Sequence, residues 1–173
     1  MRTLFITLSA IALLAGCSSK EQKEVKPEII FTNHAEPEEW VNLGTIRENA
    51  NAHSGRFVSF IDSVTPYSLG IIKQIKDISM QPIDSVTVSY WAFLKNINTG
   101  AQTVFSLDDP NGKNIAWVGN PLKSKVKEVN KWVEVKETFK FPANVDKQSK
   151  LALYVWNTSK EEILLDDFQV TFH

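Results

Sequence analysis

The chain is poor in cysteine, in histidine and in net charge. Its 173 residues include one cysteine and three histidines, and the formal net charge is −1 at pH 7. A lone cysteine cannot form an internal disulfide, so a disulfide-stapled scaffold is excluded. A chain this close to neutral lacks the basic character of proteins that bind phosphate backbones, and we expect no nucleic-acid partner. A three-histidine zinc site would need His34, His53 and the terminal His173 to converge, which the sequence does not favour.

The sequence also lacks an apolar run long enough to remain in a membrane as a spanning helix. Residues 1–16, MRTLFITLSAIALLAG, combine one arginine, an uncharged apolar stretch and small residues before Cys17, which is the pattern of a signal peptide. The stretch is shorter than the about 20 residues that a spanning helix needs. The quartet LAGC at 14–17 resembles the lipobox of bacterial lipoproteins, in which the cysteine thiol carries a diacylglycerol. We predict lipidation of Cys17; the alternative is an ordinary secreted protein with a free thiol.

A tether follows the predicted anchor. Residues 17–27 are polar, mixed in charge and almost free of large apolar side chains, which predicts a flexible linker. In lipoproteins of bacteria with two membranes, an aspartate after the anchor cysteine often means retention in the inner membrane. By that resemblance Ser18 favours the outer membrane, so we expect a lipid-anchored protein of the outer membrane or cell surface. The remaining residues, 28–173, have the length of one domain.

Long helical patterns are missing from residues 28–173, where short runs of β-branched and aromatic residues alternate with turn residues. The sequence DDPNGK at 108–113 contains Pro and Asn-Gly between two such runs and predicts a loop or hairpin. Strands at this spacing predict an all-β sandwich or barrel, with at most a helical turn at 37–41. The predicted strands are EIIF, GRFVSFI, LGIIKQI, VTVSYWAFL, QTVFSL, NIAWV, KWVEVKETFKF, LALYVW and EILLDDFQVTF.

Alternation along two of these strands separates a core face from an aromatic face. The aliphatic sets, predicted to be core, are Val86, Val88, Tyr90, Ala92 and Leu94 in one strand and Leu151, Leu153 and Val155 in the other. Large aromatic side chains on an outer face are unusual unless they bind something, although loops or a second layer could cover them. The candidate ligand-binding residues are Trp91, Phe93, Tyr154, Trp156 and Asn157, with Gln102 and Lys95 as further hydrogen-bonding groups.

The last run, ILLDDFQVTFH at 163–173, holds two carboxylates inside an apolar stretch. Strict alternation places Asp166 on the same face as Leu164 and Phe168, so this carboxylate is predicted to face the core. A buried carboxylate needs a cation, a metal or several hydrogen-bond donors, because an isolated buried charge is too costly. Asp167 is expected to face the opposite way.

Several segments, in order, resemble the signature positions of galactose-binding-like β-sandwich domains, the jelly-roll fold of many carbohydrate-binding modules. They are NHAEPEEW at 33–40, NAHSGRFVSF at 51–60, KWVEVKETFKFP at 131–142 and LYVWN followed by ILLDDFQV near the end. The resemblance covers nearly the whole chain beyond the tether. It implies a two-sheet jelly roll and non-catalytic binding of a glycan.

The resemblance also implies one structural calcium ion, which takes about six to eight oxygen ligands. Residue by residue, the implied ligands are His34 and Arg56 through their carbonyl oxygens, Glu36 and Asp166 through their carboxylates, and Ser54. The chain departs from the family pattern at Ala35, where phenylalanine is common, and EPEE offers Glu36, Glu38 and Glu39 as the early acid. The alternative is an Asp166 without metal, held by hydrogen bonds or paired with Arg47 or Arg56.

These observations favour a non-catalytic glycan-binding lipoprotein of the cell envelope. The alternative is a protein-interaction or scaffolding module that uses the same sandwich to dock an envelope partner. An enzyme is not expected, because no residues with matched catalytic roles are recognisable and Cys17 would carry lipid. The adjacent carboxylates Asp166 and Asp167 would face opposite ways on a strand, so they could not flank a glycosidic bond.

Overall fold

The computed structural model describes residues 28–36 and 43–173. The predicted signal peptide over 1–16, the tether with Cys17 and the helical turn at 37–41 lie outside these residues. The strands are β1 (Ile29–Asn33), β2 (Ile46–Glu48), β3 (Phe57–Ile61), β4 (Tyr67–Gln74), β5 (Ser85–Leu94), β6 (Ala101–Asp108), β7 (Asn114–Pro121), β8 (Trp132–Lys140), β9 (Lys150–Asn157) and β10 (Ile163–Phe172). Short 3-10 turns occupy η1 (Leu43–Thr45), η2 (Ile75–Asp77) and η3 (Leu122–Ser124).

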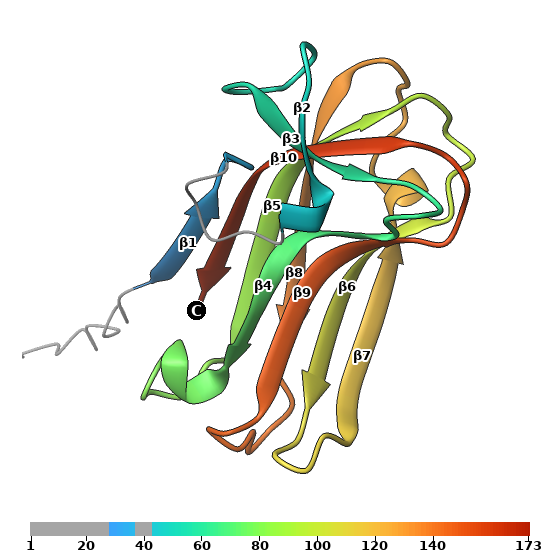
Figure 1. Ribbon diagram of the computed structural model, residues 1–173. Coiled ribbons are helices and arrows are strands. Elements are labelled where there is room, and N and C mark those ends of the chain that lie inside the picture. Colours follow the sequence, from blue (N-terminus) through green and yellow to red (C-terminus); the bar gives the residue numbers. More distant parts are fainter. Residues whose placement is uncertain (1–27, 37–42) are drawn as a thin grey trace, which may run out of the picture.

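The strands form two antiparallel sheets that pack as layers (Figure 1). The larger sheet has the order β2-β3-β10-β5-β8, with β1 also paired to β10, and the smaller sheet has the order β4-β9-β6-β7. The all-β, two-sheet sandwich predicted from the sequence is therefore confirmed. The strand β2 was not predicted, because its three residues include two charged ones and give no apolar run. Within the described residues, no helix has the length and apolar character needed to cross a membrane.

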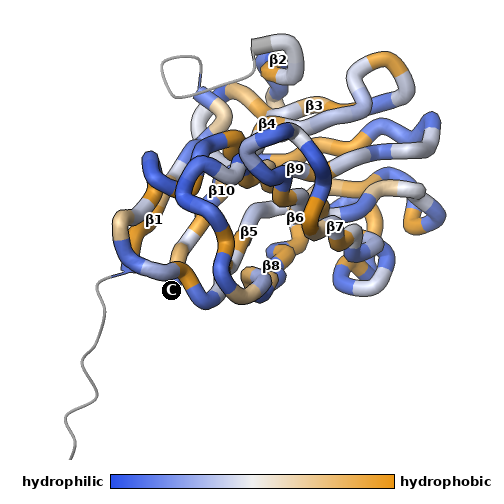
Figure 2. The backbone as a smooth tube through the Cα atoms, turned by 90° about the horizontal axis from the view of Figure 1, so that it is seen from below, coloured by the Kyte–Doolittle hydropathy of each residue, from blue (hydrophilic) through white to orange (hydrophobic). Residues whose placement is uncertain are grey.

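The core lies between the two sheets and follows the predicted alternation. Hydrophobic stretches recur along the strands (Figure 2). The predicted core residues of β5 and β9 are all at most 3% exposed. Tyr90 of β5 also crosses the core, because its hydroxyl makes a 2.6 Å hydrogen bond with the hydroxyl of Thr103 on β6. Burial raises the pKa of Tyr90, so the phenol stays neutral and joins the two sheets by an uncharged bond.

The prediction that Asp166 faces the core is wrong, and a β-bulge is the reason. In β10, Asp166 pairs with Trp91 while Gln169 pairs with Ser89, so two residues of β10 oppose the single residue Tyr90. The extra residue is Asp167, whose φ of 50° is left-handed, a conformation that aspartate tolerates better than most residues. Strict alternation therefore holds only on each side of the bulge.

At the bulge, the residues of β10 that face the core change from odd-numbered to even-numbered positions. Leu165 before the bulge and Phe168 after it both belong to the core, and the Phe168 ring stacks on Tyr90 at 5.0 Å. Asp166 is fully buried, as predicted, but it lies on the outer face of the larger sheet beside Trp91. Asp167 lies next to it, not on the opposite face.

Removing the hydroxyl that joins the sheets should destabilise the protein. We expect Tyr90→Phe to lower the free energy of unfolding by about 1 to 2 kcal/mol, because it leaves the buried Thr103 hydroxyl without its partner. Chemical denaturation measures this loss. The double variant Tyr90→Phe with Thr103→Val removes both polar groups and should recover part of it; a double variant that loses the sum of the single losses would contradict the pairing.

Candidate functional site

The outer face of the smaller sheet carries a cluster of aromatic side chains from several strands, which we call the aromatic face. The strand register places Tyr67 of β4 opposite Trp156 of β9, and Trp156 opposite Gln102 of β6. One row further along β9, Tyr154 lies opposite Gly70 of β4 and Val104 of β6. The aromatic face is defined by Tyr67, Trp117, Tyr154 and Trp156.

The rings of the aromatic face contact one another and remain accessible. Tyr67 stacks on Trp156 with ring centroids 6.3 Å apart, and it meets Tyr154 edge to face at 5.7 Å. Burial raises the pKa of the Tyr154 phenol, and the nearby Trp117 indole opposes that rise. Tyr67 is 49% exposed and Trp117 is 48% exposed. The face therefore presents connected, uncharged rings to solvent.

A hollow lies beside these rings, where Gly70 has no side chain to fill the space. Its volume is about 380 Å³, and its lining includes the rings of Tyr67 and Tyr154 and the exposed side chain of Ile72. A Cβ atom on Gly70 would lie 2.1 Å from the carbonyl oxygen of Leu153, so no other residue fits without moving β9. The glycine thus allows close strand pairing and keeps the hollow open.

Trp117 and Tyr67 were not among the residues predicted to bind a ligand. Trp117 stands in the predicted strand NIAWV, where alternation with Ile115 and Gly119 could have placed it on an outer face. Tyr67 directly precedes the predicted run LGIIKQI, and β4 begins earlier than that run. A β-bulge between Tyr67 and Gly70 keeps both residues on the aromatic face, and alternation cannot anticipate it.

The structure divides the residues that were predicted to bind ligand. Trp91 and Phe93 lie on β5 of the larger sheet, so they are on the opposite side of the sandwich from Tyr154 and Trp156. Trp91 stacks on His53 at 4.0 Å, and Phe93 contacts Trp132 at 5.6 Å. Trp91 thus packs against the loop 49–56, and Phe93 packs against β8. Neither half-buried ring can form one binding surface with the aromatic face.

Asn157 is also not available to a ligand in this structure. It is 2% exposed, and its side-chain amide donates to the carbonyl of Glu161 at 2.7 Å. Its side-chain oxygen accepts from the backbone N–H of Ser159 at 3.0 Å and from the Ser159 hydroxyl at 2.7 Å. Asn157 therefore closes the turn after β9. Lys95 pairs with Glu162, whereas Gln102 does lie beside the aromatic face.

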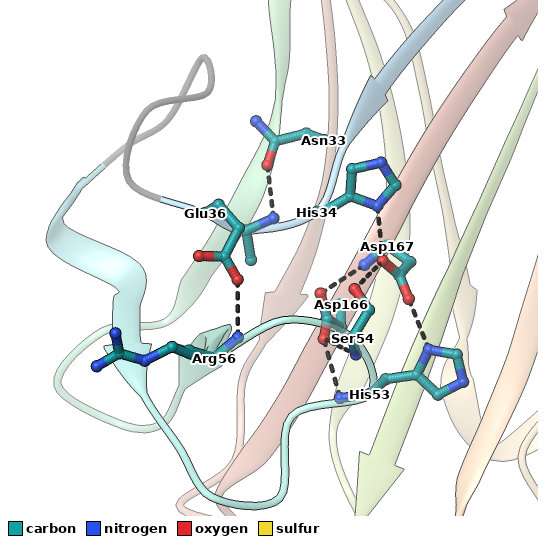
Figure 3. A network of polar contacts seen from close by, with 9 residues as sticks. Asn33, His34, Glu36, His53, Ser54, Arg56, Asp166 and Asp167 are labelled. Carbon is teal, nitrogen blue, oxygen red and sulfur yellow. Dashed lines mark hydrogen bonds and ion pairs between the residues drawn. The ribbon is translucent and has the colours of Figure 1, made fainter.

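A second cluster of polar groups lies on the other side of the sandwich, at a gap in the larger sheet. Along one edge of β10, β3 pairs with residues 163–165 and β1 pairs with residues 168–172. Asp166 and Asp167 lie between these two partners. Because His34 follows β1 and the loop 49–56 leads into β3, the topology brings both segments to the gap (Figure 3).

The Asp166 carboxylate accepts hydrogen bonds from backbone N–H groups. One of its oxygens accepts the N–H groups of His53 at 3.0 Å and Ser54 at 3.1 Å, and the other accepts the N–H of Asp167 at 2.8 Å. Burial raises the pKa of Asp166 to about 6, while the N–H donors oppose that rise. Of the two predicted alternatives for Asp166 without metal, the geometry shows the hydrogen-bonded one. Arg47 donates to the carbonyl of Ile46, and the Arg56 guanidinium pairs with Glu48.

The Asp167 carboxylate is hydrogen-bonded to side chains. One oxygen is 2.8 Å from Nδ1 of His34 and accepts the hydroxyl of Ser54 at 2.5 Å, and the other is 2.5 Å from Nδ1 of His53. Figure 3 shows the carboxylate between the two imidazole rings. Burial acts to raise the pKa of Asp167, but the hydrogen bonds from Ser54, His34 and His53 outweigh it, so the pKa is lowered and the group is ionised.

The predicted early acid lies apart from this pair. Glu36 accepts the backbone N–H of Arg56 at 2.8 Å and covers Gly55, whose φ is 55°. The carbonyl of Arg56, a predicted calcium ligand, accepts the N–H of Asn49 at 2.9 Å. The structure thus brings Ser54 to Asp166, whereas Glu36 and Arg56 bond to each other. Glu38 and Glu39 lie outside the described residues.

The described residues do not gather the predicted calcium ligands into one set. N–H groups already occupy three of the about four lone-pair positions of Asp166, and one Glu36 oxygen and the Arg56 carbonyl each accept an N–H group as well. Within residues 28–36 and 43–173, no group of three or more histidine, cysteine, aspartate or glutamate side chains is placed to hold a metal ion. The calcium ion remains a prediction from the resemblance.

The same cluster has the residue types of a catalytic triad but not its geometry. The Ser54 hydroxyl donates to Asp167 and not to a histidine nitrogen, so no imidazole is placed to accept its proton. Both aspartates lie on one face because of the bulge, contrary to the prediction. Asp166 is nevertheless fully buried, and both oxygens of Asp167 are hydrogen-bonded, so the pair cannot flank a glycosidic bond.

Comparisons with known proteins support the fold. No protein-family model matches the chain, and no curated protein matches it in sequence. Among solved structures, the chain is similar to the CBM22-1 xylan-binding domain from Paenibacillus barcinonensis Xyn10C, with 18% identity, a TM-score of 0.50 and coverage of 82% of this chain and 92% of that one. The CBM22-2 xylan-binding domain of the same protein gives 13% identity, a TM-score of 0.51 and coverage of 83% and 99%. The chain shares the β-sandwich fold of these carbohydrate-binding modules, so the fold predicted from the sequence is confirmed.

Trp91 is expected to contribute to stability. We expect Trp91→Ala to lower the free energy of unfolding by about 2 kcal/mol, because it removes the ring on which His53 stacks and exposes the buried Asp166 beside it. The loss would be larger for a fully buried ring, but Trp91 is only half buried. Thermal or chemical unfolding measures it. Trp117→Ala, at a position of the smaller sheet that is 48% exposed, is the control and should lose less stability than Trp91→Ala. Equal stabilities of the two variants would contradict this assignment.

Proposed function

We propose that the protein binds a glycan chain on the aromatic face without catalysing its cleavage. The observation that carries the proposal is the exposed set of contacting rings beside the hollow at Gly70. Small-molecule sites combine apolar walls with a few polar groups that fix orientation. A sugar ring offers an apolar face for stacking and hydroxyl groups at its edge, so it suits a surface of this kind.

Polar groups border the rings where sugar hydroxyls would need partners. Gln102 lies opposite Trp156 on one side. On the other side, the Asn114 amide donates to the hydroxyl of Ser106 and to the carboxylate of Asp108, each at 2.9 Å. These groups are uncharged except for Asp108, which lies opposite the exposed Lys150 of β9. The border of the face therefore carries no net charge, which suits a neutral polysaccharide.

The fold and the shape of the face support a glycan over a protein partner. The two solved structures with the same fold are named as xylan-binding domains, and xylan is a neutral polysaccharide backbone in its unsubstituted form. Docking of a protein calls for a broad, flat apolar patch, whereas this face is hollowed at Gly70. We therefore place the protein-interaction module second.

The cell location proposed from the sequence complements this function. We propose that Cys17 carries a lipid, that residues 17–27 act as a tether, and that the sandwich is displayed from the outer membrane or cell surface. A tethered binding module would hold a polysaccharide close to the cell without any chemistry of its own.

Loss of rings from the aromatic face should weaken glycan binding. We expect Tyr67→Ala and Trp156→Ala each to weaken the affinity for soluble xylan, or for the glycan selected on an array, by about tenfold, which is about 1.4 kcal/mol. Affinity electrophoresis or calorimetry measures the change.

The control for this test is Trp132→Phe, which alters an aromatic residue of the larger sheet and should leave glycan affinity unchanged. Thermal unfolding of every variant confirms that the fold is intact. Folded Tyr67 and Trp156 variants with the parent affinity would contradict the proposed surface, and a parent protein that retains no glycan on an array would contradict the function.

A further inference from the structure

The gap between β1 and β3 along β10 contains two carboxylates with little exposure to solvent, which is energetically costly unless they are compensated. Two adjacent carboxylates lie there, one fully buried and one with a side chain 18% exposed. Ionised carboxylates in such positions need compensating charge or several hydrogen-bond donors. The described residues supply donors in sufficient number, and they come from both segments that border the gap.

The donors for Asp166 are built into the backbone. Consecutive N–H groups of His53 and Ser54 point at one oxygen, and the N–H of the bulge residue points at the other. An ionised carboxylate has about four lone-pair positions, and three of them are used in this way. Backbone N–H groups carry no charge to lose and need no bound ion, so this part of the arrangement forms whenever the loop 49–56 lies on β10.

The donors for Asp167 tie the two segments together. His34 follows β1 and His53 precedes β3, and each imidazole places Nδ1 within hydrogen-bond distance of the same carboxylate. A neutral imidazole with its proton on Nδ1 is a sufficient donor, so neither ring has to be charged. The Ser54 hydroxyl adds a third side-chain donor, and the stacking of His53 on Trp91 fixes the ring.

We propose that this network, which we call the clasp (His34, His53, Ser54, Asp166 and Asp167), closes the gap in the larger sheet without a metal ion. In the clasp, backbone N–H donors take three of the about four lone-pair positions of Asp166, the carboxylate that a structural calcium would need. The clasp joins the segment after β1 to the segment before β3 through β10. It lies on the other side of the sandwich from the aromatic face, so this inference is independent of the proposed glycan binding.

Metal dependence gives the first test. The purified protein is unfolded by heat after extensive chelation, and again with added calcium chloride. We expect the melting temperature to be the same in both conditions, because a clasp made of the chain's own donors gains nothing from the ion. A ligand at 100 times its dissociation constant would raise the melting temperature by several degrees. A rise of that size on adding calcium, absent in Asp166→Asn, would overturn the inference.

Substitutions within the clasp give the second test. Asp167→Asn keeps the size and the left-handed backbone but removes the charge and an acceptor oxygen, and it should lower the melting temperature by about 5 °C. Ser54→Ala removes one donor and serves as the milder variant if Asp167→Asn fails to fold. Unchanged melting temperatures in both variants would overturn the inference.

A matched pair at His53 separates the hydrogen bond from the ring stack. His53→Asn retains an N–H donor near the Nδ1 position but loses the stack on Trp91, whereas His53→Phe retains the stack and loses the donor. The clasp requires that His53→Phe lowers the melting temperature although it keeps the stack. Full stability of His53→Phe would show that the ring alone matters and would overturn the role of the donor. Glycan affinity should not change in any of these variants.

Discussion

The β-bulge at Asp167 is the constraint on which the arrangement of the larger sheet depends. It inserts one residue opposite Tyr90, which places Phe168, Val170 and Phe172 in the core and leaves both aspartates on the outer face. The bulge coincides with the point where β10 changes neighbours from β3 to β1. Donors from the flanking segments can reach the carboxylates there because no strand occupies that edge. One irregular residue thus determines which groups pack inside and which bond outside.

The two outer faces of the sandwich have different roles in this account. On the larger sheet, the aromatic residues Trp91 and Trp132 pack against the loop 49–56, and Trp132 donates its indole N–H to the carbonyl of Asn51 at 3.0 Å. On the smaller sheet, no loop of the described chain supplies a comparable stacking partner to Tyr67 or Trp117, which are each close to half exposed. Aromatic residues therefore serve packing on one side and remain free for a ligand on the other.

Much of the fold could be predicted from the sequence, because alternation reports on which face of a strand meets the core. It placed the buried residues of β5 and β9 correctly, and the Asn-Gly turn correctly marked the hairpin between β6 and β7. The candidate site could be predicted less well from the sequence. Alternation says that Trp91 and Trp156 are off the core, but it does not say that they belong to different sheets. Alternation also cannot detect a β-bulge, so it predicted the wrong face for Asp166 and left Tyr67 out of the predicted ligand-binding residues.

The measurement that tests the central claim most directly is a crystal structure of the protein grown in the presence of calcium. The account predicts electron density in which the Asp166 oxygens face the N–H groups of His53 and Ser54, Asp167 lies between His34 and His53, and no ion is bound to either carboxylate. A calcium ion coordinated by Asp166, with carbonyl oxygens of the loop 49–56 turned toward it, would contradict the account.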